Sequence, residues 1–207
     1  MLKRNSLRRL VLICSLTLLA SSGCSGLTSS DKPAVTTWWL KPYTGVAMLE
    51  TETARAPLSV SIKAIPGLDT DRILALTSDA ELKPYASARW TENLPELTRS
   101  MVVRTLTGSG RFDVMSGGDF STAETCRLNL ELSKFFANLD AAGQTDNVEV
   151  AFEGRLQCPS KADVWLQLEH TEAVQDQRMK NIVASFQRAL DAVMKQMLLR
   201  LEKSKSS

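Results

Sequence analysis

The sequence predicts an α+β domain in which a mixed or antiparallel sheet, containing a disulfide-linked hairpin, packs against two helices. The first observation is a pair of segments, 126–136 and 148–158, in which apolar and polar residues alternate as in half-buried strands. The second is a pair of helical patterns, at about 93–107 and 181–202, whose apolar residues recur every three or four positions. Shorter alternating segments supply the remaining strands of the predicted sheet.

The first 24 residues have the layout of an export signal that ends in a cysteine. Four basic residues precede an apolar run at 10–20, which is shorter than the ~20 residues that cross a bilayer. The small residues at 21–23, followed by Cys24, resemble the lipobox of bacterial lipoproteins, with Ser21 where Leu is usual. The resemblance implies removal of 1–23 and acylation of Cys24, by chains such as palmitate. Ordinary secretion, with Cys24 as a plain thiol, is the alternative.

Residues 24–36 are predicted to be a flexible tether, and residues 37–203 a single globular domain. The tether region is rich in Ser and Thr and contains Pro33. Loss of the four basic residues of the signal leaves 21 Lys and Arg against 23 Asp and Glu. No basic run and no basic helix face stands out in the sequence, which argues against nucleic acid as a partner.

Short strands are predicted in the first half of the domain. They are at 38–40, 58–65 and 72–77, with 81–90 as the hairpin partner of the third. Each is bounded by Pro, Gly, Ser or Asp, which are common in turns.

The first helix is expected to begin near Asn93. Asn93 and Glu96 have the spacing of a capping box, and Pro95 is tolerated in the first helical turn. Gly108 and Gly110 end the pattern, and a short strand at 112–114 follows.

Cys126 and Cys158 are predicted to form a disulfide. If their strands pair antiparallel about Ala142, Cys126 faces Cys158 and Leu132 faces Phe152, and a slip of one residue would separate all of these pairs. The alternative is two free buried thiols. Zinc is not expected, because two Cys and a single His form no ligand cluster. Because no Cys-x-x-Cys is present, the bond is expected to be structural, contributing about 3–4 kcal/mol.

The last predicted elements are a strand at 164–168, running toward His170, and the helix at 181–202. The apolar stripe of this helix has the width of a face that packs on a core. Binding of a partner by the same stripe is the alternative.

No residue pattern predicts catalysis, so an enzyme is not expected, and neither a metal nor another cofactor is predicted beyond the lipid on Cys24. The sequence lacks the Gly-x-x-x-x-Gly-Lys-Ser/Thr pattern that cradles ATP phosphates. Tyr85, Arg89 and Trp90 are candidates for an Arg–aromatic stack. Such a stack would either hold the hairpin on the helix or contact a partner.

The order of short motifs along the domain carries a resemblance. The motifs are Trp38-Trp39-Leu40, Pro66-Gly67-Leu68, Asp71-Arg72, Tyr85, and Arg89-Trp90 at the entry to a helix. Together they resemble the ABC-type transport auxiliary lipoprotein family, the PqiC-like proteins that accompany MCE-domain lipid transporters. Thr91 and Asn93 stand where that family often has Ala and Pro.

The resemblance implies a lipoprotein anchored on the periplasmic face of the outer membrane, and Ser25 in place of Asp after the lipidated cysteine favours that membrane. The implied partners are an MCE-domain protein and separate ABC permease and ATPase subunits. The implied task is to dock the periplasm-spanning component during phospholipid transport. Self-association into a ring would suit the end of a tunnel, although no residue demonstrates it. The alternatives are a structural envelope lipoprotein and a module that binds lipid itself.

Overall fold

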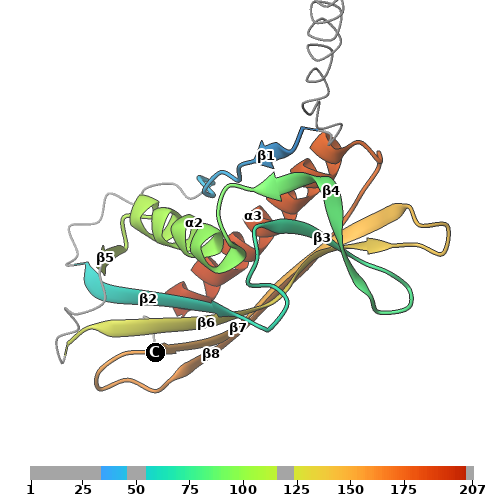
Figure 1. Cartoon of the computed structure of the whole chain (residues 1–207). Helices are drawn as coiled ribbons and strands as arrows, with labels where there is room; N and C mark the ends of the chain where they lie inside the picture. Colours follow the sequence, from blue (N-terminus) through green and yellow to red (C-terminus); the bar gives the residue numbers. More distant parts are fainter. Residues whose placement is uncertain (1–33, 46–54, 116–123, 204–207) are drawn as a thin grey trace, which may run out of the picture. The chain divides into compact units, whose positions relative to one another are not determined.

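The computed structural model describes residues 34–45, 55–115 and 124–203, so the predicted signal peptide and Cys24 lie outside the described residues. The described residues form an α+β fold of eight strands and two helices (Figure 1). The elements are β1 (Thr36–Trp38), β2 (Ala56–Ala64), β3 (Arg72–Leu76), β4 (Leu82–Trp90), α2 (Leu94–Gly108), β5 (Phe112–Met115), β6 (Cys126–Leu139), β7 (Thr145–Gln157), β8 (Val164–Ala173) and α3 (Met179–Lys203).

Strand β6 organises the mixed sheet, because the two halves of one of its edges have different neighbours. On one edge β6 pairs antiparallel with β7, which in turn pairs with β8. On the other edge, residues 126–132 pair parallel with β2, which in turn pairs with β5, whereas Ala137 and Asn138 pair with β3. Strand β3 continues through β4 to β1. The sheet therefore forks at the middle of β6.

The predicted hairpin register and disulfide are confirmed. Leu132 lies opposite Phe152, and Cys126 is bonded to Cys158 with their Cα atoms 4.2 Å apart. Beyond Leu132 the pairing shifts by one residue at Ser133. This bulge changes the phase of the alternation. As a result the core side of β6 passes from even-numbered to odd-numbered residues.

The predicted capping box is wrong, although α2 begins where the sequence indicates. The side chain of Asn93 makes no cap bond, and its Nδ2 donates to Asp69 Oδ1 at 3.3 Å. Asn93 thus bonds Asp69, which is distant in the sequence, instead of the backbone of the first helical turn. Pro95 lies in the first turn, and the helix ends at Gly108.

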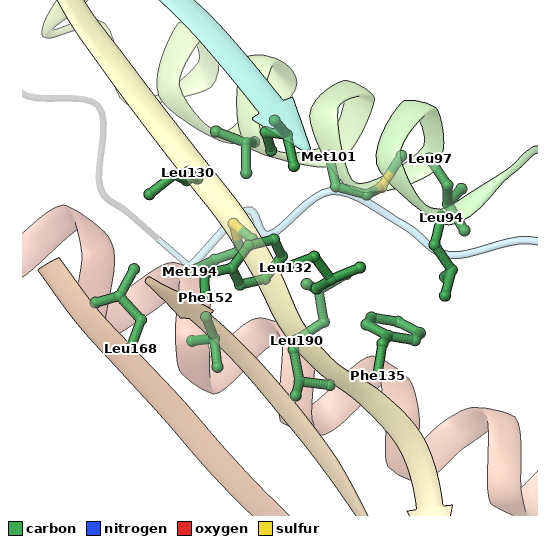
Figure 2. Packing of buried hydrophobic residues seen from close by; sticks show 14 of the residues in the cluster. Leu94, Leu97, Met101, Leu130, Leu132, Phe135, Phe152, Leu168, Leu190 and Met194 are labelled. Carbon is green, nitrogen blue, oxygen red and sulfur yellow. The ribbon is translucent and has the colours of Figure 1, made fainter. Parts of the chain in front are cut away.

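Both helices cover the same face of the sheet (Figure 1). Helix α2 packs on β2 and β5, and α3 packs on β7 and β8. Figure 2 shows Leu94 and Met101 of α2 and Leu190 of α3 converging on the core with Leu132 and Phe135 of β6. The predicted apolar stripe of α3 is buried in this core.

Residues 39–43, here called the strap, cross the helix layer between α2 and α3. Leu40, within the strap, is fully buried and packs in the core. The backbone N–H of Lys41 donates to Gln187 Oε1 at 2.7 Å, and Gln187 Nε2 donates back to the Lys41 carbonyl at 2.9 Å. The N–H of Tyr43 donates to Thr105 Oγ1 of α2 at 3.2 Å. The strap is therefore bonded to both helices.

Candidate functional site

The three residues predicted as an Arg–aromatic stack make three separate contacts. Trp90 is only 2% exposed and meets Phe135 and Phe186 edge to face, with ring centroids 5.7 and 5.4 Å away. Arg89, its neighbour on the strand, points to the opposite side and forms a 3.2 Å ion pair with Asp71. The predicted stack is therefore wrong, because strand alternation separates the two side chains.

Tyr85 makes the third contact, far from the other two. Its hydroxyl lies 2.7 Å from Thr145 Oγ1, at the start of β7. Partial burial raises the pKa of Tyr85, and the bond to Thr145 opposes this effect. Trp90 thus belongs to the core, whereas a partner contact by Tyr85 or Arg89 stays a prediction.

A short series of charged side chains links β8 to α3. His170 Nε2 lies 3.3 Å from Glu172, which also accepts a 2.6 Å hydrogen bond from Arg188 Nε of α3. The Arg188 bond is the main reason that the pKa of Glu172 is lowered. Among the described residues, no group of three or more His, Cys, Asp or Glu is placed to hold a metal ion.

The face of the sheet away from the helices carries an exposed tryptophan that the sequence analysis did not single out. Trp165 of β8 is 71% exposed, and the Cζ atom of Arg155 lies 5.7 Å from its ring centroid. A hollow of about 500 Å³ beside it, at the β8 edge of the sheet, is also lined by Glu153 and Gln167 of the strands and by Arg200 of α3. The signal was present in the sequence, since Trp165 occupies a polar position of the alternation between Val164 and Leu168.

A second exposed tryptophan lies over the helix layer. Trp39 opens the strap and is 57% exposed, with the Cζ atom of Arg104 of α2 at 5.9 Å from its ring centroid. Its neighbours Trp38 and Leu40 pack toward the core. The sequence analysis placed Trp39 in a strand, but β1 ends at Trp38.

The two helices gather positive charge that is dispersed in the sequence. They contain seven Lys or Arg and three Asp or Glu, whereas β7 and β8 contain one Arg and five Asp or Glu. The sequence analysis found no basic face on a single helix, and this excess is a property of the two helices together. The charges belong to helices more than 70 residues apart, and only folding brings them into one layer.

No described helix is long and apolar enough to cross a membrane.

Beside the disulfide lies an apolar pocket of about 220 Å³, to which Leu156, Val164 and Leu201 contribute. This pocket and the surfaces around Trp39 and Trp165 are the candidate sites of the domain.

Comparison with solved structures supports the fold. A crystal structure of an uncharacterized protein aligns with a TM-score of 0.65 and 13% identity, covering 81% of this chain and 99% of the other. A Xanthomonas campestris protein that carries the family label DUF330 aligns with a TM-score of 0.64 and 16% identity, covering 83% and 100%. At such identities these likenesses show the fold alone.

The family comparison covers most of the domain. No curated protein matches the sequence. The model of the ABC-type transport auxiliary lipoprotein component family matches residues 46–198, which is well over half of the sequence. The chain therefore belongs to the family of ABC-type transport auxiliary lipoprotein components.

Proposed function

We propose that this protein is the outer-membrane lipoprotein subunit of an MCE/ABC-type system that moves phospholipid between the two membranes of the envelope. In this role it docks the periplasm-spanning MCE component at the outer membrane. Membership of the auxiliary lipoprotein family is the observation that carries the proposal. The lipobox-like segment ending in Cys24 supports an anchored subunit, and the missing ATP-binding pattern assigns ATP hydrolysis to a separate subunit.

The physical need for such a subunit follows from the chemistry of the cargo. Each methylene of a lipid tail costs about 0.8 kcal/mol in water, so a phospholipid needs a sheltered route across the periplasm. A route of this kind needs an attachment at its far end. Acyl chains on Cys24 would hold the subunit in the membrane, since each buried methylene contributes about the same energy.

The face of the sheet around Trp165 is the surface that best suits the periplasm-spanning partner. Among the described residues no second layer covers this face, and the 500 Å³ hollow lies at its β8 edge. Tryptophan and arginine are the residue types most enriched among those that dominate binding energy at protein interfaces. Trp165 and Arg155 supply this combination in one contact.

The test is affinity capture of the full-length protein, with a C-terminal tag and intact Cys24, from crosslinked and detergent-solubilised membranes. Mass spectrometry is expected to identify an MCE-domain protein. Trp165→Ala combined with Arg155→Gln is expected to lower its recovery at least tenfold. Trp39→Phe, on the other side of the domain, is the matched control and should leave recovery unchanged. Recovery of lipidated wild-type protein without any MCE-domain protein would overturn the proposal.

A module that binds lipid itself is the second candidate, favoured by the apolar pocket beside the disulfide. Its volume of about 220 Å³ exceeds the ~150 Å³ at which an apolar cavity can hold benzene. Native mass spectrometry of the purified protein distinguishes the candidates. A co-purified phospholipid that Val164→Trp displaces would support this second function. Protein carrying only its covalent lipid would exclude it.

A further inference from the structure

We propose that the domain makes a membrane contact of its own, in which the outer side of the helix layer at Trp39 lies against an anionic phospholipid surface. The contacting residues are Val35, Trp39, Lys41 and Arg104, here called the membrane patch. The inference rests on the proposed anchoring at Cys24. It adds a protein surface, and hence an orientation of the domain, to that anchor.

The shape of the strap exposes the membrane patch. Leu40 is buried and Trp38 packs on the core, so the residues on either side of Leu40, namely Trp39 and Lys41, point outward. Val35 precedes β1 and is 45% exposed. Two of the large apolar side chains exposed on the described surface therefore lie within five residues of each other.

The indole of Trp39 has the chemistry of a membrane-interface residue. Tryptophan is enriched at both membrane–water interfaces, because its ring is apolar and its N–H is polar. The guanidinium of Arg104 lies over this ring and is exposed. Arginine can place its aliphatic stem along apolar surface while its charge reaches phosphate groups. The pair thus offers one apolar and one cationic group to the same layer of headgroups.

The charge around the membrane patch complements an anionic bilayer. Lys41 and Arg104 take part in none of the ion pairs of the described residues. The surrounding helices carry seven basic and three acidic residues. The acids near the patch are Asp191, which accepts a hydrogen bond from Gln187, and Glu92, whose neighbour Thr91 donates its N–H to the Trp38 carbonyl at 3.1 Å. Positive groups close to an anionic leaflet are attracted to it within a Debye length.

The position of the membrane patch along the chain keeps it near the bilayer. Val35 follows Cys24 by eleven positions, which limits the distance between them to about 40 Å. A contact tethered at this range acts at high effective concentration, so a small surface suffices. Trp165 lies on the face of the sheet away from the helix layer, so a domain that rests on the membrane patch turns Trp165 away from the bilayer.

The test uses lipidated full-length protein in vesicles of phosphatidylethanolamine and phosphatidylglycerol whose acyl chains carry bromine, a short-range quencher of tryptophan fluorescence. Bromolipid quenching of the wild type is expected to fall at least threefold in Trp39→Phe. Trp165→Phe is the matched control and should keep the wild-type quenching. Replacing phosphatidylglycerol by phosphatidylcholine, or substituting Arg104→Gln with Lys41→Gln, should lower quenching about twofold. Equal quenching of the wild type and Trp39→Phe would overturn the proposal.

Two further measurements separate this proposal from the proposed function. Intact-protein mass spectrometry reports whether Cys24 carries lipid. If it does not, the same protein is coupled through Cys24 to a thiol-reactive lipid in the vesicles, and Trp39-dependent quenching then decides for or against the patch. Trp39→Phe is also expected to capture the MCE-domain protein normally. Loss of that capture with wild-type quenching would assign Trp39 to the partner interface and overturn the membrane contact.

Discussion

The two faces of the domain present the same pair of side chains in opposite settings. On the helix layer Arg104 lies over Trp39, and on the open face of the sheet Arg155 lies over Trp165. The first pair sits among basic helices near the predicted tether, whereas the second sits on strands rich in Asp and Glu beside a hollow. The two contacts thus differ in the charge around them and in their distance along the chain from the proposed anchor at Cys24. We infer a membrane contact for the first pair and a protein contact for the second.

The largest loss of stability is expected from a change in the aromatic core, because this core supports both faces of the domain. Phe186 is fully buried, stacked on Phe135 at 5.1 Å and edge to face with Trp90. Phe186→Ala should lower the free energy of unfolding by about 3–5 kcal/mol, because it removes a buried ring and leaves a cavity. Urea denaturation measures this loss. Leu199→Ala on the exposed side of α3 is the control, and a similar loss in both variants would refute the assignment.

Removing the disulfide should weaken the sheet more than the helix layer. Cys126→Ala combined with Cys158→Ala opens a link across 32 residues and is expected to cost about 3–4 kcal/mol of stability. In hydrogen exchange, the ends of β6 and β7 next to the bond should lose protection first. The strap amides of Lys41 and Tyr43 should keep the protection that they have in the wild type. Earlier loss in the strap would mean that the two faces are not held separately.

The strap can be tested without touching the sheet. Gln187→Ala removes both bonds to the Lys41 backbone and should cost about 1–2 kcal/mol. Gln187→Glu keeps the acceptor for the Lys41 N–H, but it loses the donor and places a second carboxylate beside Asp191, so a loss at least as large is expected. Limited proteolysis with chymotrypsin should cut Gln187→Ala first within the strap, after Trp39 or Tyr43. Unchanged cleavage there would show that Leu40 and the bond from Tyr43 to Thr105 hold the strap without Gln187.

The smallest effect is expected from the link between β8 and α3. The hydrogen bond from Arg188 holds the pKa of Glu172 below its usual value of 4.5. A lowered folded-state pKa stabilises the fold above pH 4.5, and this contribution is lost as the pH falls through the folded pKa. Because both side chains are partly exposed, Glu172→Gln should cost about 0.2–1 kcal/mol at pH 7. Urea denaturation from pH 7 to pH 3 should show the variant and the wild type converging. A constant difference would contradict this account.

The sequence predicted the parts of the fold that depend on local periodicity. The hairpin register and the disulfide followed from two alternating segments that fit together in one way only. Both helices followed from their apolar stripes. The bulge at Ser133 was also visible in principle, because the spacing from Leu132 to Phe135 breaks the alternation.

The rest depended on contacts between distant segments. The fork in the sheet arises because β2 and β3 share one edge of β6, and no local pattern states this. Asn93 has the sequence of a cap, but Asp69 competes for its side chain. The basic helix layer and the strap likewise combine residues from Lys41 to Arg188. The sequence shows where Trp39 and Trp165 occur, but only the fold places Arg104 and Arg155 over their rings.

The strap also has a mechanical consequence. Tension on the membrane anchor would enter the domain at Val35 and pass along β1, which is bonded to β4 over three residue pairs. Within three residues of the end of β1 it would meet the buried Leu40 and the clamp between Lys41 and Gln187. The load is then shared by an edge strand, the core and the longest helix before it reaches the central strands. The domain is therefore expected to stay folded while the membrane and a partner on the sheet face pull in opposite directions.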